Sequence, residues 1–94
     1  MKTITTETLK YDQFIEIYGD TLMSFVSYYK YTFYFTGKTA DGKTIDASYG
    51  GSSEDIYRYD VSVIPVPLRQ IEPLDATVCD ADDNKIHKLE YQGW

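Results

Sequence analysis

The sequence predicts an α+β fold, with a mostly antiparallel sheet of four or five strands and one N-terminal helix packed on one face. Three observations predict it. Apolar residues near the N-terminus have helical spacing, a long run of strand-forming residues follows, and two segments show the alternation and turn residues of hairpins. The chain has 94 residues, which suits a single compact domain over residues 1–94.

The helix is predicted at about residues 8–18. Four apolar side chains recur at intervals of three and four residues, which places them on one helix face: Tyr11, Phe14, Ile15 and Tyr18. Thr8 is the predicted N-cap, and Gly19 is predicted to end the helix in a left-handed conformation. Several of these residues also favour strands, so a strand is the alternative for this segment.

A strand is predicted from Leu22 to Thr36, because Tyr, Phe, Val and Thr dominate this run. It is predicted to turn back through a three-residue loop, Ala40-Asp41-Gly42, with Gly42 left-handed. This register makes one face continuously apolar and pairs Phe33 with Tyr49, Phe35 with Ala47 and Gly37 with Ile45. A two-residue loop would place polar residues opposite the aromatic ones, so the apolar face decides the register.

Alternation along this strand predicts two faces with different roles. The face toward the core and the helix is predicted to hold Phe25, Tyr29, Tyr31, Phe33 and Phe35. The other face is predicted to hold Val26, Tyr28, Lys30, Thr32, Tyr34 and Thr36. This second face is too polar for a second core, yet it is more aromatic than a solvated surface requires.

The last part of the chain predicts one more strand and a second hairpin. A short helical turn capped by Ser52 precedes a strand that starts near Tyr57 and ends at Pro65 or lies at a sheet edge. The hairpin has arms at about residues 74–80 and 85–91, with its turn in Asp82-Asp83-Asn84.

The charge of the chain restricts the classes of partner. Fifteen acidic and nine basic residues give a net charge of −6, and residues 53–94 hold nine of the acids and four of the bases. Such a surface repels phosphates, so we expect no direct nucleic-acid binding, whereas a basic protein is attracted. The sequence has no long apolar run and no apolar segment after Lys2, so neither a membrane span nor a secretory signal is predicted. The single cysteine, Cys79, excludes an internal disulfide, and the predicted compartment is the cytoplasm.

Four features that suggest chemistry are better explained by structure. Asp80, Asp82 and Asn84 match the first ligand positions of a calcium-binding EF-hand loop, but Lys85 replaces the required glycine and Tyr91 the required glutamate. The run therefore predicts an acidic hairpin turn, with no metal and no cofactor.

His87, the only histidine, is predicted to be a surface residue on a strand, and Cys79 a small strand residue. "YGGSS", at residues 49–53, lacks the lysine of a phosphate-binding loop and is followed by two acids, so it predicts a strand-to-turn connection.

These observations predict a non-enzymatic protein-binding inhibitor, because tyrosines and carboxylates suit a contact with a basic, nucleic-acid-binding protein. The predicted binding residues are Tyr28, Lys30, Tyr34, Asp80, Asp82 and Asp83. In size and charge alone, the chain is similar to phage-encoded anti-CRISPR and other anti-defence proteins and to immunity proteins against toxic nucleases. The alternatives are a phage structural or assembly subunit, which includes a homodimer, and a hydrolase that uses His87.

Overall fold

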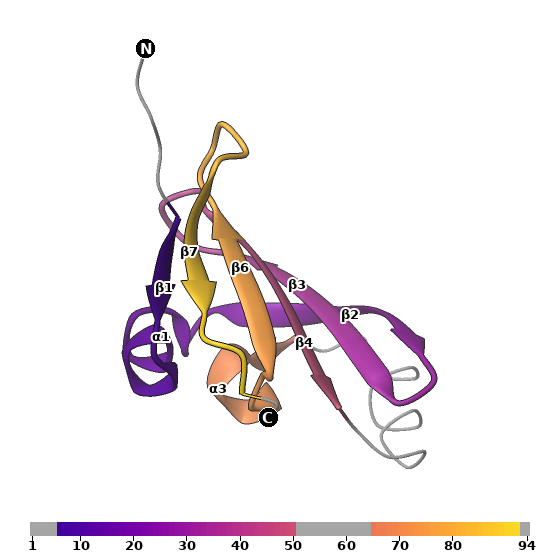
Figure 1. Cartoon of the computed structure of the whole chain (residues 1–94). Coiled ribbons are helices and arrows are strands. Elements are labelled where there is room, and N and C mark those ends of the chain that lie inside the picture. Colours follow the sequence, from indigo (N-terminus) through magenta and orange to yellow (C-terminus); the bar gives the residue numbers. More distant parts are fainter. Residues whose placement is uncertain (1–5, 51–64, 93–94) are drawn as a thin grey trace.

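A computed structural model describes residues 6–50 and 65–92, and these form one mixed sheet of seven strands (Figure 1). The strands lie side by side in the order β1-β7-β6-β4-β3-β2-β5. The elements are β1 (Glu7–Leu9), α1 (Tyr11–Tyr18), β2 (Leu22–Tyr29), β3 (Thr32–Lys38), β4 (Thr44–Gly50), β5 (Val66–Pro67), α3 (Leu68–Ile71), β6 (Asp75–Cys79) and β7 (Lys85–Leu89). The predicted architecture, four or five strands with one helix, is therefore wrong.

The N-terminal segment contains a strand that was not predicted. Residues Glu7–Leu9 form β1, which pairs in parallel with β7, and Leu9 is buried in the core. Thr8 therefore lies in a strand and does not cap the helix, which begins at Tyr11. The amide of Lys10 donates to the side-chain oxygen of Gln13 at 3.2 Å, which satisfies one of the amides at the start of the helix.

The helix ends at Gly19, but not in the predicted conformation. Gly19 has a φ of −60°, which is right-handed, and its amide donates to the Ile15 carbonyl at 2.7 Å. A Cβ at this position would overlap the Ile15 carbonyl oxygen. Close approach of the backbone, not a left-handed stop, therefore explains why glycine is suited to this position.

The predicted β3–β4 hairpin is confirmed in its register and its loop. Phe33 pairs with Tyr49 and Phe35 with Ala47, as the apolar face required. The amide of Thr39 donates to the Lys43 carbonyl at 2.8 Å across the three-residue loop. Gly42 has a φ of 90°, the left-handed conformation that the loop needs.

Replacing Gly42 with alanine is expected to lower the free energy of unfolding by about 1–2 kcal/mol, because a side chain at this φ strains the backbone. No atom of the described residues lies within 4 Å of the added methyl group, so backbone strain is the whole expected effect. Urea denaturation measures it, with the exposed neighbour Asp41→Ala as the control that should be milder. Equal, small effects of both substitutions would contradict the backbone argument.

The predicted strand from Leu22 to Thr36 is wrong, because the chain reverses at Lys30 and Tyr31. Tyr29 pairs with Thr32, which makes a two-residue loop between β2 and β3, and Lys30 has a φ of 56°. A β-bulge after Phe25 shifts the register once more. The alternation therefore does not continue through the segment, and the two predicted faces do not exist as such.

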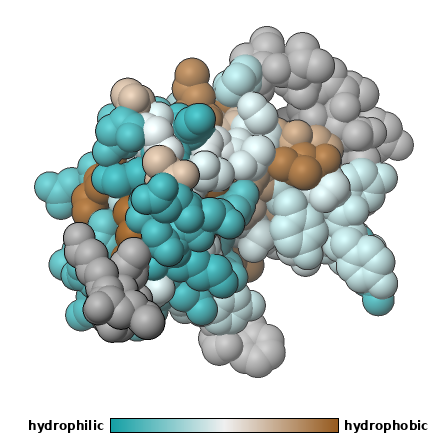
Figure 2. Space-filling model, turned by 90° about the horizontal axis from the view of Figure 1, so that it is seen from above, coloured by the Kyte–Doolittle hydropathy of each residue, from teal (hydrophilic) through white to brown (hydrophobic). Residues whose placement is uncertain are grey.

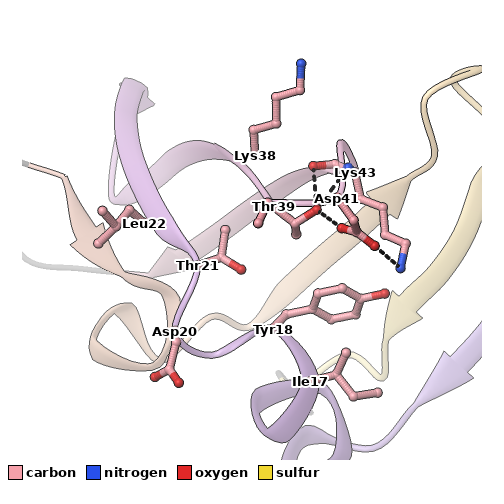
Figure 3. A pocket seen from close by; sticks show the side chains of 10 residues that line it. Ile17, Tyr18, Asp20, Thr21, Leu22, Lys38, Thr39, Asp41 and Lys43 are labelled. Atoms are coloured by element: carbon pink, nitrogen blue, oxygen red, sulfur yellow. Dashed lines mark hydrogen bonds and ion pairs between the residues drawn. The ribbon is translucent and has the colours of Figure 1, made fainter.

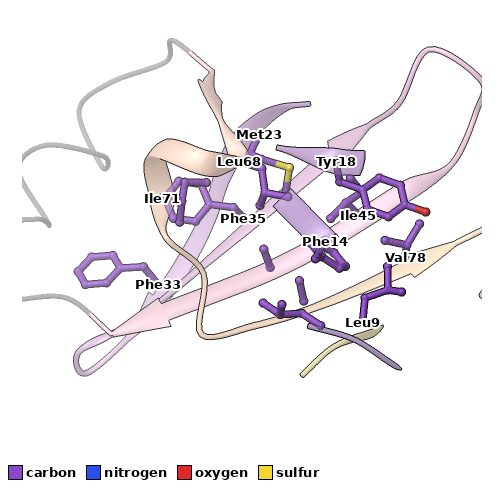
Figure 4. Close-up of a cluster of buried hydrophobic side chains, with 13 residues drawn as sticks. Leu9, Phe14, Tyr18, Met23, Phe33, Phe35, Ile45, Leu68, Ile71 and Val78 are labelled. Carbon is purple, nitrogen blue, oxygen red and sulfur yellow. The ribbon is translucent and has the colours of Figure 1, made fainter. Parts of the chain in front are cut away.

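The two helices that the structure describes, α1 and α3, pack on one face of the sheet, and their buried side chains join those of the strands in one core (Figure 4). The sheet contributes large buried side chains to it, namely Met23, Phe33, Phe35, Ile45, Val78 and Leu89. The helices cover them with Phe14, Tyr18, Leu68 and Ile71. We call the opposite side of the sheet the open face.

The C-terminal hairpin is confirmed, with β6 and β7 as its arms and its turn between Cys79 and Lys85. The strand predicted from Tyr57 and the turn capped by Ser52 lie outside the described residues. At the end of that segment, β5 is the edge of the sheet and pairs with the first two residues of β2, Leu22 and Met23. Across residues 6–50 and 65–92, no helix has the length and apolar character needed to cross a membrane.

Candidate protein-interaction site

The six predicted binding residues lie in three separate places on the sheet. Tyr28 and Lys30 lie at the β2–β3 turn, Tyr34 lies within β3, and the three aspartates lie in the β6–β7 turn. The β6–β7 turn is beside the opposite end of β3, because Lys38 pairs with Thr44 and Thr44 with Cys79. The seven residues of β3 span roughly 20 Å, so the β2–β3 turn, which is rich in aromatic residues, and the acidic β6–β7 turn are at opposite ends of the sheet.

Tyr28 faces the core side, which the sequence did not predict. It pairs with Phe33, and the two rings stack with centroids 5.8 Å apart. It also stacks on Phe25 at 6.3 Å, although 42% of its surface is exposed. At the turn itself, the Lys30 ammonium lies 5.6 Å from the centroid of the Tyr29 ring. Tyr28 therefore supports the end of the core as well as being exposed.

Tyr34 lies on the open face, and 41% of its surface is exposed. It pairs with Ser27 on one side and Ser48 on the other, and Ser48 in turn pairs with Asp75 of β6. Tyr28 and Tyr34 are therefore on opposite faces of the sheet. A partner that lies flat on one face contacts only one of these two tyrosines.

The acidic turn uses one of its aspartates for structure. The Asp80 carboxylate accepts hydrogen bonds from the amides of Asp82 and Asn84, both at 2.9 Å, and from the Asn84 side chain at 3.3 Å. These hydrogen bonds, first those from Asn84, hold the pKa of Asp80 below its ordinary value. Asp83 has a φ of 66°, which aspartate and asparagine tolerate well. Asp82 and Asp83 are exposed, and their carboxylates take no part in the hydrogen bonds that hold the turn.

Asp80→Asn is expected to lower the melting temperature at pH 7 and to flatten its decline in acid. The folded-state pKa is depressed, so the stabilisation is present above the unfolded pKa of about 3.9 and is lost as pH falls through the folded value. Thermal unfolding from pH 6 to pH 2 measures it. Asp82→Asn is the matched control, and equal acid slopes for the parent and Asp80→Asn would contradict the structural role of Asp80.

Some carboxylates at this end of the sheet have ion-pair partners and others have none within residues 6–50 and 65–92. Asp41 pairs with Lys43 at 3.0 Å, and Asp20 pairs with Arg69 at 2.9 Å. Neither Asp82 nor Asp83 forms an ion pair with another described residue. Figure 2, which views the molecule from above, shows mostly hydrophilic residues over the near surface. The end of the sheet with the β6–β7 turn is therefore a polar, acidic surface.

An open groove of about 570 Å³ lies between the end of α1 and the β3–β4 loop (Figure 3). Its charged side chains largely compensate one another, since Asp41 pairs with Lys43 and also accepts a hydrogen bond from the Thr39 hydroxyl. This hydrogen bond first, and Lys43 second, lower the pKa of Asp41, and Asp41 raises the pKa of Lys43. The four charged side chains that line the groove sum to no net charge, since Asp20 and Asp41 stand against Lys38 and Lys43.

His87 is not the surface residue that the sequence predicted. It lies on β7 facing α1, and its Nδ1 is 2.5 Å from the Tyr18 hydroxyl. Its Nε2 is 3.8 Å from a carboxylate oxygen of Glu7 on β1. Burial raises the pKa of Tyr18, so the phenol remains protonated and is able to donate to the imidazole. These contacts connect α1 to both parallel strands, which gives His87 a structural role.

Cys79 is a half-buried strand residue, in agreement with the prediction. Burial first, and then the nearby Asp83 and Asp46, raise the pKa of its thiol, so the reactive thiolate is disfavoured. In the described part of the chain, no three His, Cys, Asp or Glu side chains are grouped so that they could hold a metal ion.

A second hollow, of about 190 Å³, lies on the open face over β4 and β6. The sequence analysis did not predict this hollow. Its two carboxylates, Asp46 and Asp75, are far apart in the chain, and the pairing of β4 with β6 brings them together. The sequence does contain one indication of a shared polar face: Asp46 and Ser48 alternate with apolar residues on one strand, and Asp75 and Thr77 do so on the other.

The comparisons with known proteins identify no relative. The chain matches no protein-family model, no curated protein and no solved structure.

Proposed function

We propose that this protein is a small, acidic, non-enzymatic inhibitor that binds a basic, nucleic-acid-handling protein and covers the surface that would hold nucleic acid. The observation that carries the proposal is the set of carboxylates without ion-pair partners among the described residues, together with an exposed tyrosine on the same sheet. These carboxylates are Asp46 and Asp75 on the open face and Asp82 and Asp83 in the β6–β7 turn.

Occlusion is the mechanism that suits this surface. Carboxylates occupy the places on the partner where phosphates would bind, and the net charge of −6 accelerates the approach to a basic surface. Tyr34 supplies a large, rigid contact with a polar end, which is typical of residues that dominate protein interfaces. Because the acidic surface repels phosphates, the inhibitor itself does not bind nucleic acid.

The biological setting that we propose is a phage or another mobile element, where an anti-CRISPR or other anti-defence protein acts in the host cytoplasm. An immunity protein against a toxic nuclease would use the same surface and the same mechanism on a different partner. Both settings require a partner that binds nucleic acid through a basic surface.

One observation favours the alternative of an assembly subunit or homodimer. Within the described residues, β5 is one edge of the sheet and pairs with Leu22 and Met23 of β2. An edge strand is able to pair with a second copy of the chain. Light scattering after gel filtration tests this alternative, because pairing between edge strands requires the mass of two or more chains and the mass of a single chain would exclude it.

The proposal predicts competition with nucleic acid. Capture from a host lysate and mass spectrometry identify the partner, and a labelled nucleic acid then reports its displacement as this protein is added. We expect full displacement at saturation, whereas gel-shifts of this protein with free DNA or RNA at physiological salt should show no complex. A partner that still binds its nucleic acid fully when saturated with this protein would refute occlusion, and tight binding of free nucleic acid would refute the class of function.

The acidic turn should affect association rather than dissociation. Asp82→Asn with Asp83→Asn retains the turn, because Asp80 is unchanged, and should slow association and flatten its dependence on salt. Glu16→Gln with Glu90→Gln, two exposed acids elsewhere, is the control with the same change in charge. An equal effect of both pairs would mean that only net charge matters.

A further inference from the structure

The hollow on the open face holds two carboxylates, those of Asp46 and Asp75, and neither forms an ion pair with a described residue. Asp46 lies on β4 opposite Thr77, and Asp75 lies on β6 opposite Ser48, so the two aspartates are diagonal neighbours. Side chains in this relation have Cα atoms about 7–8 Å apart. Neither aspartate forms an ion pair with a residue in the described ranges, so their negative charges repel each other across the hollow.

The carboxylate of Asp75 also has an oxygen atom without a hydrogen bond among the described residues. The Oδ1 atom of Asp75 is buried from solvent, and it has no hydrogen-bond partner in the described part of the chain. A buried acceptor without a donor is costly, and for a charged group the cost is larger. Because the carboxylate turns easily about its last torsion angle, either oxygen is able to meet a donor that enters the hollow.

The remaining walls of the hollow suit a flat cation. Tyr34 borders it with its exposed ring, and Ser48 and Thr77 supply hydroxyl groups between the two carboxylates. The volume of about 190 Å³ is below the range of small-molecule pockets, about 300–1,000 Å³, and therefore suits one side chain. Lys88, one strand beyond Thr77, pairs with that residue in the sheet but does not line the hollow.

We propose that this hollow receives an arginine side chain of the partner protein, with the guanidinium bridging Asp46 and Asp75 and packing against the ring of Tyr34. A guanidinium is planar, has five donors in a fixed arrangement, stacks on aromatic rings and is easier to desolvate than an ammonium group. Lysine has neither the planar shape nor the five fixed donors, so arginine is the specific occupant. The inference rests on the proposed function, because it names the chemistry that the inhibitor recognises on its partner.

The test uses N-acetyl-arginine amide as the probe and N-acetyl-citrulline amide, its uncharged counterpart of the same shape, as the control. Amide NMR shifts of the intact protein are followed during titration at constant ionic strength. We expect saturable shifts centred on residues 46–48 and 75–77, with a dissociation constant on the order of millimolar for arginine and at least about tenfold weaker binding for citrulline. The lysine analogue should bind more weakly than arginine.

Variants assign the binding to the two carboxylates. Asp46→Asn with Asp75→Asn should weaken arginine binding about tenfold or more, and Glu16→Gln with Glu90→Gln should leave it unchanged. The comparison of arginine with citrulline uses the parent chain, so it decides the question even if the double variant does not fold. Equal shifts with arginine and citrulline, shifts centred elsewhere, or tighter binding of Ca²⁺ at the same amides would overturn the assignment.

Binding of the arginine probe and displacement of nucleic acid from the partner are separate measurements, so they test the arginine site and the proposed function independently. If the arginine probe does not bind but the protein displaces nucleic acid from its partner, the hollow is not the recognition site and the inhibitor proposal stands. If the probe binds as expected but no displacement occurs, the hollow is an arginine site in a protein of another function.

Discussion

Phe33→Ala is expected to lower the free energy of unfolding by about 3–5 kcal/mol, the usual cost of deleting a buried aromatic ring. Phe33 has no exposed surface, and its ring stacks with those of Tyr49 and Tyr28 at centroid distances of 5.3 and 5.8 Å. It lies in the central strands of the sheet, where the surrounding side chains are held by β2 and β4 and collapse into the cavity only partially. Because small domains are stable by only about 5–15 kcal/mol, the variant should be largely destabilised at 37 °C.

Tyr34→Ala, at the next position on the same strand, is the control for this substitution. It removes a ring of similar size from the open face, where 41% of Tyr34 is exposed, so its effect on unfolding should be much smaller. Urea denaturation of the two variants and the parent gives the comparison. Similar stabilities for both variants would mean that the buried and open faces of β3 are assigned incorrectly.

The parts of the fold that the sequence predicted are those in which local pattern and buried face agree. In the β3–β4 hairpin, Gly42 marks the loop, and only one register places Phe33 and Phe35 opposite apolar residues. The acidic turn was predicted for a similar reason, since Asp83 adopts the positive φ that such residues tolerate. In both hairpins the pairing strands are adjacent in the sequence.

The parts that the sequence did not predict lack such signals. The turn between β2 and β3 has Lys30 at a positive φ, where glycine or asparagine is usual. The residues of this segment therefore do not indicate that the chain reverses there. Strand β1 has three residues, too few for an alternation, and its parallel partner β7 lies almost at the other end of the chain. Pairing between distant segments depends on the whole fold and is not specified by local propensity.

The same reason explains the outcome for the candidate site. Counting residues in steps of two places Tyr28 and Tyr34 on one face, but the two-residue turn at Lys30 and Tyr31 places them on opposite faces. No local pattern groups Asp46 with Asp75, because only the pairing of β4 with β6 brings them together. Exposed tyrosines and surplus acids were evident in the sequence, but which of them share a surface was not.

The structure therefore predicts different roles for the two tyrosines in a complex with the partner. Tyr34→Ala is expected to raise the dissociation rate about 30-fold or more, the effect of losing an interface residue worth about 2 kcal/mol, with little change in the association rate. Tyr34 borders the acidic hollow on the open face, so its ring contacts whatever binds there. Tyr34→Phe retains the ring and should stay close to the parent.

Tyr28→Ala should show the reverse pattern. Its ring stacks on Phe33 and Phe25 on the core side, so its loss should lower the free energy of unfolding by about 1–2 kcal/mol while the dissociation rate of the complex remains near that of the parent. Surface plasmon resonance with the partner identified by capture measures the rates, and urea denaturation the stability. If Tyr28→Ala accelerates dissociation and Tyr34→Ala does not, the partner binds at the end of the sheet that holds the β2–β3 turn, and the open face is not the inhibitory surface.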